Sequence, residues 1–369
     1  MSKATETLLE IDLNALGHNY RYLTSKIKPD TKVLAVVKAF GYGSDATVVA
    51  QELVKLGADY FAVAYAIEGA SLREGGITAP ILVLHPLPTN FDLIVEKCLE
   101  PSIYSKKMLQ DFIAFAEKNN QREYPIHLKF NTGLNRLGFR NSDINFITEA
   151  LSKTKSVVVK SAFSHLAASE DPSEEQFTKT QLDSFRSISK ELSEKLGYRP
   201  LLHNLNTSGI INYPEAQFDM VRTGIGLYGF GNNSEEDKKL KAVATLKTVI
   251  SQIHDIHKGE SVGYNRAFNA VQTTKTATLP IGHADGISRA YGNGKGWVSI
   301  AGQKAPIVGN VCMDMIMVDI SSIECNEGDE AIVFGNNPTA EALSSAINSI
   351  PYELLTAISQ RVKRVVRRK

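Results

Sequence analysis

A lysine at the end of an apolar run is the residue with the clearest potential for chemistry in this sequence. Residues 33–37 are all apolar and mostly β-branched, Lys38 follows them directly, and Tyr42 lies four residues further on between two glycines. The run predicts a buried parallel strand, where a charged amine costs several kcal/mol unless it is paired, neutralised or covalently used. Burial and nearby cations lower the pKa of an amine, so Lys38 could attack a carbonyl and form a Schiff base. The alternative is a lysine that extends to solvent at the strand end, and the run alone does not decide between the two.

Length and charge exclude several function classes. The 369 residues exceed what one core usually organises, so two domains are expected. The 41 basic and 40 acidic residues leave a net charge of +1, which removes the electrostatic argument for nucleic acid or a membrane as the main partner. We therefore expect a small-molecule substrate.

The cysteines and the two ends of the sequence indicate a protein of the cytoplasm. Cys98, Cys312 and Cys325 are odd in number and lack metal-ligand spacing, so we expect neither a disulfide framework nor a metal site. Residues 1–7 are polar and no apolar run reaches 18 residues, which argues against a signal peptide or a membrane span. The basic tail, residues 361–369, could touch polyanions, but its alternating valines favour a solvated edge strand.

Alternating strand and helix patterns fill the first two thirds of the chain. Eight β-rich runs occur between residues 30 and 230, separated by amphipathic or polar segments long enough for crossover helices. This alternation predicts a closed (β/α)8 barrel, an α/β fold with its catalytic residues at the carboxyl ends of the strands. The predicted strands are residues 33–37, 60–64, 81–85, 101–104, 126–130, 157–165, 201–205 and 220–228, and predicted helices include 46–56, 91–98, 107–118, 144–151 and 174–196.

The sequence pattern changes after a polar, glycine-rich linker at residues 229–237. Beyond it, short β-rich runs are joined by Gly, Pro and Asn without long helical patterns. We therefore expect a barrel domain at 1–237 and an all-β domain at 238–369, and residues 8–12 can pair with the second domain instead of the barrel. The predicted strands of the second domain are residues 242–250, 276–280, 297–300, 305–308, 316–320 and 331–334.

Polar residues that packing does not explain gather at the predicted mouth of the barrel. The small residues after strands seven and eight could let backbone amides converge on a phosphate. A Schiff-base lysine beside a phosphate site suggests pyridoxal phosphate. Each residue also has a simpler explanation: Thr207–Gly209 as a turn, Arg136 in a surface ion pair, or His165 as a core histidine. The candidates at this mouth are Lys38, Tyr42, Lys129, Asn131, Arg136, His165, Asn206, Thr207, Arg222 and Gly224.

Motifs along nearly the whole chain resemble those of the alanine racemases, the fold-type III family of pyridoxal-phosphate enzymes. Each motif is weak alone, but all of them occur in the family's order. The matching segments are Ala-Val-Val-Lys-Ala at 35–39 with Tyr-Gly at 42–43, Thr-Gly at 132–133 with Asn-Arg-Leu-Gly at 135–138, Met-Val-Arg-Thr-Gly-Ile at 220–225 with Tyr-Gly at 228–229, Val-Gly-Tyr at 262–264, Pro-Ile-Gly at 280–282 with Ala-Asp-Gly at 284–286, Cys-Met-Asp at 312–314, Tyr-Glu at 352–353 and Arg-Val at 361–362.

The resemblance implies a role for each central residue. Lys38 would hold the cofactor and act as the base toward D-alanine, while Tyr264 from the other subunit of a homodimer would act toward L-alanine. Arg222 would face the pyridine nitrogen, where a guanidinium donates a hydrogen bond and leaves the nitrogen unprotonated, which favours reprotonation at the α-carbon. His165 would connect Tyr264 to Arg222. Arg136 would contact the cofactor's phenolic oxygen and the substrate carboxylate.

The remaining implied site residues bind the cofactor or shape the entrance. Lys129 would support Arg136, Met313 would assist substrate binding through its backbone, and His283, Arg289 and Asp314 would support or line the entrance. This sequence departs from the family's usual pattern at His283, where tyrosine is common, at Asn131, where aspartate is common, at Thr207, where serine is common, and at residues 40–41. The implied cofactor contacts are Lys38, Tyr42, Arg136, His165, Asn206, Thr207, Arg222, Gly224, Ile225 and Tyr352, with no metal.

The function that the resemblance implies is the interconversion of L-alanine and D-alanine, which supplies D-alanine for peptidoglycan. It also implies a homodimer with shared active sites. Two other classes stay open: another pyridoxal-phosphate enzyme on this scaffold, such as a serine or broad-specificity racemase or a decarboxylase, and a non-catalytic cofactor carrier. Tyr264 and the domain that delivers it argue against the carrier, and Arg222 argues against the decarboxylase.

Overall fold

The computed structural model describes residues 4–368 and divides the chain into two compact units. The barrel unit comprises Gly17–Gly41 and Ala46–Lys241, and the β unit comprises Met1–Leu16, Tyr42–Asp45 and Ala242–Lys369. Residues 1–3 of the predicted polar N-terminus and Lys369 of the basic tail lie outside the described residues. Within the described residues the chain passes between the units after Leu16, Gly41, Asp45 and Lys241, and the last of these lies four residues beyond the predicted linker.

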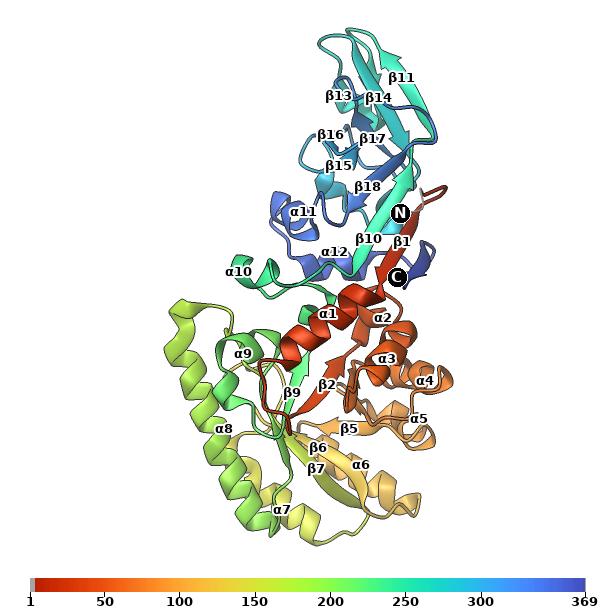
Figure 1. Cartoon of the computed structure of the whole chain (residues 1–369). Helices are drawn as coiled ribbons and strands as arrows, with labels where there is room; N and C mark the ends of the chain where they lie inside the picture. The colour runs from red at the N-terminus through yellow and green to blue at the C-terminus, as the bar shows by residue number, and fades with distance from the viewer. Residues whose placement is uncertain (1–3, 369) are drawn as a thin grey trace. The chain divides into compact units, whose positions relative to one another are not determined.

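The barrel unit is a closed, parallel, eight-stranded barrel whose strands pair in chain order (Figure 1). Strands β2 and β9 close it, with Leu34 opposite Arg222 in the register. The predicted (β/α)8 barrel with a following β-rich domain is thereby confirmed. Its strands are β2 (Lys32–Val36), β3 (Tyr60–Val63), β4 (Ile81–Val83), β5 (Glu100–Ile103), β6 (Tyr124–Lys129), β7 (Val157–Phe163), β8 (Leu201–His203) and β9 (Met220–Thr223).

Helices connect successive barrel strands, and two more, α1 (Leu13–Thr24) and α10 (Ser234–Asp237), lie before the first barrel strand and after the last. The longest, α8 (Glu175–Leu196), ends at Gly197, whose φ of 76° provides the left-handed C-cap that favours glycine. The others are α3 (Ala46–Lys55), α4 (Ala66–Glu74), α5 (Phe91–Glu96), α6 (Lys106–Lys118), α7 (Ile144–Ser152) and α9 (Thr207–Asn212), and α2 (Lys38–Tyr42) is described below.

Large apolar side chains from several strands fill the barrel interior. Leu34, Tyr60, Leu82, Phe163 and Met220 form one buried cluster, each at most 5% exposed. Side chains in a barrel of eight strands fill the interior in layers, so this cluster is a packed core and not a channel. The packed interior fixes the strands whose carboxyl ends carry the polar candidates.

The segment α2, directly after β2, is a left-handed turn. Ala39, Phe40 and Gly41 have φ values of 53°, 55° and 63°, and Tyr42 has a φ of 52°. A left-handed conformation costs about 1–2 kcal/mol for each residue other than glycine. At Gly41, a side chain would bring a Cβ within 2.9 Å of the Ala46 backbone, so glycine is required there for space as well. The chain thus accepts strain next to Lys38.

The β unit is built on a nine-stranded sheet with the order β11-β14-β17-β16-β15-β18-β10-β1-β19 (Figure 1). Strand β1 pairs antiparallel with β10 and parallel with β19, the basic edge strand expected at the tail. Two short helices, α11 (Ala340–Ala346) and α12 (Pro351–Ala357), complete the unit. The strands are β1 (Leu8–Asp12), β10 (Ala244–Val249), β11 (Gln252–Ile256), β14 (Thr274–Leu279), β15 (Trp297–Ile300), β16 (Gln303–Val308), β17 (Ile316–Asp319), β18 (Glu330–Phe334) and β19 (Lys363–Arg367), beside a separate pair of β12 (Ser261–Val262) and β13 (Phe268–Asn269).

Parts of the strand prediction are wrong, and the two-residue strands β12 and β13 were not predicted. The run at residues 220–228 is not one strand, because β9 ends at Thr223 and a 3-10 helix, η5 (Ile225–Tyr228), follows. Strand β11 was missed because its sequence, Gln-Ile-His-Asp-Ile, is polar and none of its residues is fully buried. Backbone pairing with β14 stabilises it without an apolar face.

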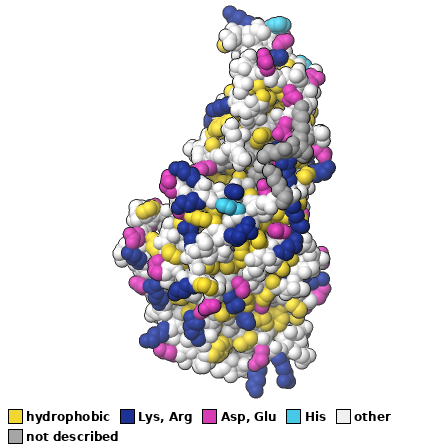
Figure 2. Space-filling model, in the orientation of Figure 1, with side chains coloured by type: hydrophobic (Ala, Val, Ile, Leu, Met, Phe, Trp, Pro, Cys, Tyr) yellow, Lys and Arg dark blue, Asp and Glu magenta, His cyan; other side chains and the backbone are white. Residues whose placement is uncertain are grey.

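Charges are mixed on the surface. On the face shown in Figure 2, basic and acidic side chains are interspersed, with hydrophobic side chains between them. Within residues 4–368, no helix has the length and hydropathy needed to cross a membrane.

A buried lysine links β1 to its neighbours in the sheet. Nζ of Lys247 on β10 lies 3.3 Å from a carboxylate oxygen of Glu10 and 3.2 Å from one of Glu330, and its side chain is only 2% exposed. These are ion-pair distances without good hydrogen-bond angles. Arg367 on β19 also pairs with Glu10. Removing one member of a buried ion group leaves the others uncompensated.

We expect Lys247→Met to lower the free energy of unfolding by about 3–5 kcal/mol, because Glu10 and Glu330 lose their shared cation. Urea denaturation followed by circular dichroism measures this change. Lys275→Met, which removes an exposed lysine from β14, is the matched control and should change the value by about 0.5 kcal/mol or less. Equal stability of the two variants would contradict the assigned role of Lys247.

Candidate functional site

Four cationic side chains meet at the carboxyl ends of the barrel strands. Lys38 follows β2, Lys129 ends β6, Arg136 lies in the loop after β6, and Arg222 is on β9. Burial lowers the pKa of Lys38, Arg136 lowers it further, and Glu68 opposes the shift. Burial, followed by Arg136, Arg222 and Lys38, lowers the pKa of Lys129 to about 8. Mutual repulsion in a poorly solvated site is therefore present before any ligand binds.

Arg222 is buried among neutral acceptors. Its NH1 donates to Nδ1 of His203 at 2.8 Å, and its NH2 donates to the carbonyls of Ser164 at 2.7 Å and Asn204 at 2.9 Å. NH2 also lies 3.1 Å from Nδ1 of His165. Burial lowers the pKa of Arg222 to about 9. Within the described part of the chain, its Nε–H makes no hydrogen bond and is left as the donor for a ligand.

The proton of His165 can be placed from this contact. Because a guanidinium only donates, Nδ1 of His165 must accept, and the proton of a neutral ring then sits on Nε2. Burial, then Arg222, Arg136, Lys129 and Lys38, lowers the pKa of His165 well below its usual range. A neutral ring is therefore favoured, with its Nε2–H unpaired among residues 4–368 and available to an acceptor.

An asparagine organises the loop that carries Arg136. Oδ1 of Asn131 accepts from the amides of Gly133 at 3.1 Å and Asn135 at 2.9 Å, and its Nδ2 donates to Oδ1 of Asn135 at 2.8 Å. Gly138 closes the loop with a φ of 134°, where a Cβ would come within 2.6 Å of the Asn131 nitrogen. Arg136 itself is exposed and has no hydrogen bond or ion pair to the described residues, so its guanidinium is free for a ligand.

Small residues after β8 and β9 approach one another closely, and we call Thr207, Gly224, Ile225 and Gly226 the cradle. The Thr207 hydroxyl lies 3.4 Å from the Gly224 amide and 3.3 Å from the Gly226 amide. A Cβ at Gly226 would come within 2.5 Å of Thr207, so the approach requires glycine. Asn206 caps α9 instead: its Oδ1 accepts from the Gly209 amide at 2.8 Å and from the Ser169 hydroxyl at 2.9 Å.

Tyr42 and Tyr352 belong to the β unit and lie against one another. Their ring centroids are 6.1 Å apart with planes at 51°. Burial, and then Tyr352, raises the pKa of Tyr42, so its phenol stays protonated and can donate. Two of the ten predicted cofactor contacts are therefore adjacent in this unit.

Tyr264 lies beside an open cavity of the β unit. It begins a 3-10 helix, η6 (Tyr264–Arg266), and its side chain is 74% exposed. The cavity has a volume of about 440 Å³ and is lined by Gly263, Tyr264, Cys312, Met313, Asp314 and Met315, among others. The side chain of Met313 is 59% exposed. The structure thus brings the predicted Tyr264 and Met313 together on one surface.

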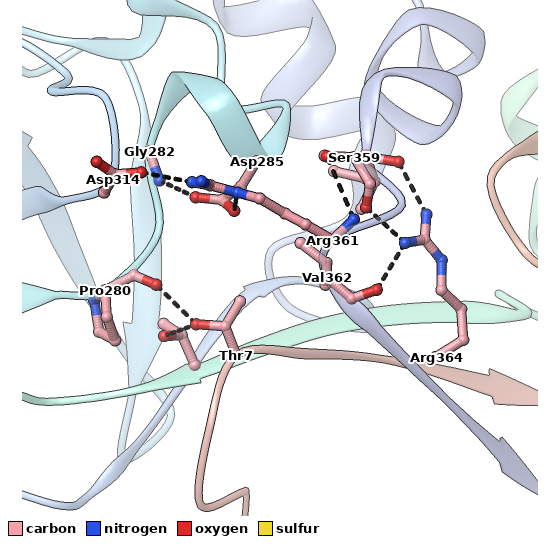
Figure 3. Close-up of polar contacts among 11 residues, drawn as sticks. Thr7, Pro280, Gly282, Asp285, Asp314, Ser359, Arg361, Val362 and Arg364 are labelled. Carbon is pink, nitrogen blue, oxygen red and sulfur yellow. Dashed lines mark hydrogen bonds and ion pairs between the residues drawn. The ribbon is translucent and has the colours of Figure 1, made fainter.

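Of the predicted entrance residues, Asp314 lines this cavity, and His283 is hydrogen-bonded to Cys312, which also lines it. The His283 amide donates to the Cys312 carbonyl at 2.9 Å, and Arg289 begins the short helix η8 (Arg289–Tyr291). Arg361 holds Asp314 in place, donating to it at 2.6 Å and to Asp285 at 2.7 Å (Figure 3). These two carboxylates raise the pKa of Arg361. Asp314 is therefore occupied by an ion pair within its own unit.

Sequence reasoning missed a buried polar layer beneath the barrel mouth. Glu100, His127, Ser161 and His203 lie inside the barrel on β5 to β8, and none was named as a candidate. The available signal was a polar residue within each of four apolar strands, where burial without a partner would be costly.

Comparison with known proteins agrees with the motifs. The sequence matches the families described as "Alanine racemase, N-terminal domain" over residues 11–231 and "Alanine racemase, C-terminal domain" over residues 243–366. It is 37% identical to the alanine racemase of Clostridium tetani, over 96% of this chain and 94% of that protein.

Solved structures give the same result. The alanine racemase of Clostridium difficile 630 superimposes with a TM-score of 0.92 at 31% identity, covering 99% of this chain and 97% of that one. The alanine racemase of Bartonella henselae, solved with covalently bound pyridoxal phosphate, gives 0.89 at 30% identity and covers 98% and 100%. With both parts of the chain matched in sequence and structure, the chain belongs to the alanine racemase family.

Proposed function

We propose that the barrel mouth binds pyridoxal phosphate through Lys38 and that the enzyme interconverts L-alanine and D-alanine with two bases. The observation that carries this proposal is the group of Lys38, Lys129, Arg136 and Arg222. Burial and the positive charges of the group lower the pKa values of Lys38 and Lys129, and Glu68 opposes the shift at Lys38. A cofactor with a phosphate and a phenolic oxygen, together with a substrate carboxylate, supplies the negative charge that such a site requires.

The donor set fits the cofactor at three points. The amine of Lys38 has a lowered pKa and suits attack on an aldehyde. The Nε–H of Arg222 is unpaired within residues 4–368 and suits the pyridine nitrogen. The cradle of Thr207, Gly224, Ile225 and Gly226 suits the phosphate, with further phenol donors expected from Tyr42 and Tyr352.

Bound pyridoxal phosphate supplies an electron-withdrawing group that acidifies the α-proton of alanine. Lys38 would take that proton through Nζ on one face of the α-carbon, which requires the neutral amine, and would return a proton as the ammonium that results. The lowered pKa increases the neutral fraction near neutral pH. The left-handed turn at residues 39–42 fixes the backbone immediately after this amine.

Tyr264 is proposed as the base on the opposite face, reaching the site of a second copy of the chain. Its exposed side chain and the open cavity beside it support this role, because a phenol that served only packing would be buried. The Nε2–H of His165 would hold the Tyr264 oxygen and connect it to Arg222. The proposal therefore requires a homodimer with shared sites, in which Met313 of the partner surface faces the substrate.

Arg136 is proposed to bind the substrate carboxylate. A guanidinium matches a carboxylate with two parallel hydrogen bonds, and this one has no competing partner among the described residues. Asn131 keeps the loop in shape, and its amide donates a hydrogen bond that the aspartate common at this position could not. Lys129 adds positive charge beside it.

The proposed biological role is the supply of D-alanine for peptidoglycan. We place it in the cytoplasm, and the three free thiols support a reducing compartment. Preference for alanine over serine would follow from the entrance, where His283, Arg289 and Asp314 are the proposed lining residues.

Lys38→Ala should abolish both the visible absorbance of the bound cofactor and turnover, because the amine is removed. Lys32→Ala, which changes a half-buried lysine of β2 that pairs with Asp59, should keep both. A mixture of Lys38→Ala and Tyr264→Ala subunits should recover about a quarter of wild-type activity, since half of the random dimers are mixed and each has one complete site. No recovery in proven mixed dimers would contradict a shared site.

Tyr264→Phe should lose racemisation but still exchange the α-proton of D-alanine with deuterated solvent. The exchange rate should rise with pH, because only the neutral amine of Lys38 accepts a proton. The midpoint of this rise should lie below 10.5, the usual pKa of lysine. Glu68→Gln should move this midpoint to lower pH, since Glu68 raises the pKa of Lys38. Nuclear magnetic resonance of D-alanine measures the rate. A midpoint that moves upward would contradict this assignment.

Asn131→Ala should raise KM for L-alanine about 10-fold and leave the cofactor absorbance unchanged, because the loop of Arg136 loses three hydrogen bonds. Asn135→Ala removes only the side-chain bond and should have a smaller effect. Steady-state kinetics checks both. A fall in kcat at unchanged KM would show that Asn131 does not act through carboxylate binding.

A further inference from the structure

Five buried polar side chains cross the barrel interior, one from each of the consecutive strands β5 to β9. His203, Ser161 and His127 are fully buried, Arg222 is 4% exposed and Glu100 is 9% exposed. We call these five residues the interior relay: Arg222, His203, Ser161, His127 and Glu100.

The contacts within the relay are all short. Arg222 NH1 lies 2.8 Å from Nδ1 of His203, and Nε2 of that ring lies 2.9 Å from the Ser161 hydroxyl oxygen. The same oxygen lies 2.5 Å from Nδ1 of His127, whose Nε2 lies 2.6 Å from a carboxylate oxygen of Glu100. Each residue therefore contacts the next, without a break from β9 to β5.

The chemistry at the two ends fixes every proton between them. The guanidinium only donates, so Nδ1 of His203 accepts and its Nε2–H donates to Ser161. The Ser161 hydroxyl then has His127 Nδ1 as its acceptor, so the His127 proton lies on Nε2 and points to the Glu100 carboxylate, which only accepts. All donors run in one direction, from Arg222 to Glu100.

Arg222 needs such a connection because its own contacts contain no carboxylate. Its partners are the side chains of His165 and His203 and three backbone carbonyls. Burial lowers its pKa to about 9, as expected for a charge that its surroundings compensate poorly. Hydrogen bonds in a chain polarise one another, so an anion at the far end strengthens the bond at the near end.

Glu100 is placed to act as that anion. Within residues 4–368 it makes no ion pair with a lysine or arginine, and its carboxylate contacts His127. Its charge is felt by its neighbours: burial, then Glu100 and Asp59, raises the pKa of Tyr60, whose ring meets His127 edge-on at 6.4 Å. His203 is held from the other side by Phe163, stacked at 4.8 Å.

We propose that the interior relay couples the Glu100 carboxylate to Arg222 and so sets the strength with which Arg222 donates to the cofactor. Glu100, His127, Ser161 and His203 are then positioning residues for the reaction. This inference rests on the proposed contact between Arg222 and the pyridine nitrogen of pyridoxal phosphate. It assigns a role to four residues that the substrate and cofactor do not touch.

The first test uses the protein without cofactor, which separates this inference from the proposed function. Nitrogen-15 resonance of the histidine rings should show His203 and His127 each protonated on Nε2 alone. A proton on Nδ1 of His203, or two protons on His127, would overturn the relay. A wild-type protein that neither takes up pyridoxal phosphate nor racemises alanine would instead overturn the proposed function.

The second test measures coupling in the loaded enzyme. Ser161→Ala should shift the cofactor's absorbance maximum and lower kcat on the order of 10-fold, with KM for L-alanine nearly unchanged, because the relay loses both hydrogen bonds of the Ser161 hydroxyl. Ser161→Thr keeps the hydroxyl and should restore both. Ser102→Ala is the matched control: this buried hydroxyl on β5 has no partner within the described chain, and its loss should change neither value.

Glu100→Gln keeps the shape and an acceptor oxygen but removes the charge, so it decides the outcome even where Ser161→Ala does not fold. It should shift the absorbance maximum in the same direction as Ser161→Ala. If Glu100→Gln and Ser161→Ala both match Ser102→Ala in absorbance and kcat, the coupling does not exist.

Discussion

Positive charge held out of water is the constraint on which this site depends. Lys38, Lys129 and Arg222 are wholly or largely buried, the exposed Arg136 adds its field, and the pKa values of the two lysines fall as a result. Such a cluster is unfavourable in the protein alone and becomes favourable when anions enter it. In the proposed function, the phosphate of the cofactor and the carboxylate of the substrate supply these anions.

Arg222, the most deeply buried cation of this cluster, is held by groups that do not neutralise it locally. Backbone carbonyls and neutral histidines surround Arg222, so it keeps its donors without a carboxylate in contact. A carboxylate there would raise the pKa of Arg222 and of the nearby amines, and Lys38 would then be a poorer base. In the proposed relay, the carboxylate of Glu100 therefore acts on Arg222 from a distance.

The sequence predicted the architecture well and the interior of the site less well. All eight barrel strands were found, because buried β-branched runs alternate with helical periodicity. The mouth residues could be named because polar side chains follow those runs. Glu100, Ser161 and His203 could not, since a single polar residue within an apolar strand shows no partner until the strands are paired. Asn206 was predicted as a cofactor contact, and the structure shows that its side chain caps α9.

The place of β1 in the sheet has a consequence for synthesis of the chain. Leu8 pairs with Lys247 on one side and with Lys363 on the other, so the first described strand finds its partners only after more than two hundred further residues have been added. At a typical elongation rate this takes roughly ten to fifty seconds. During that time the apolar residues of β1 have no sheet to join. The nine-stranded sheet can therefore be completed only after almost the whole chain has been synthesised.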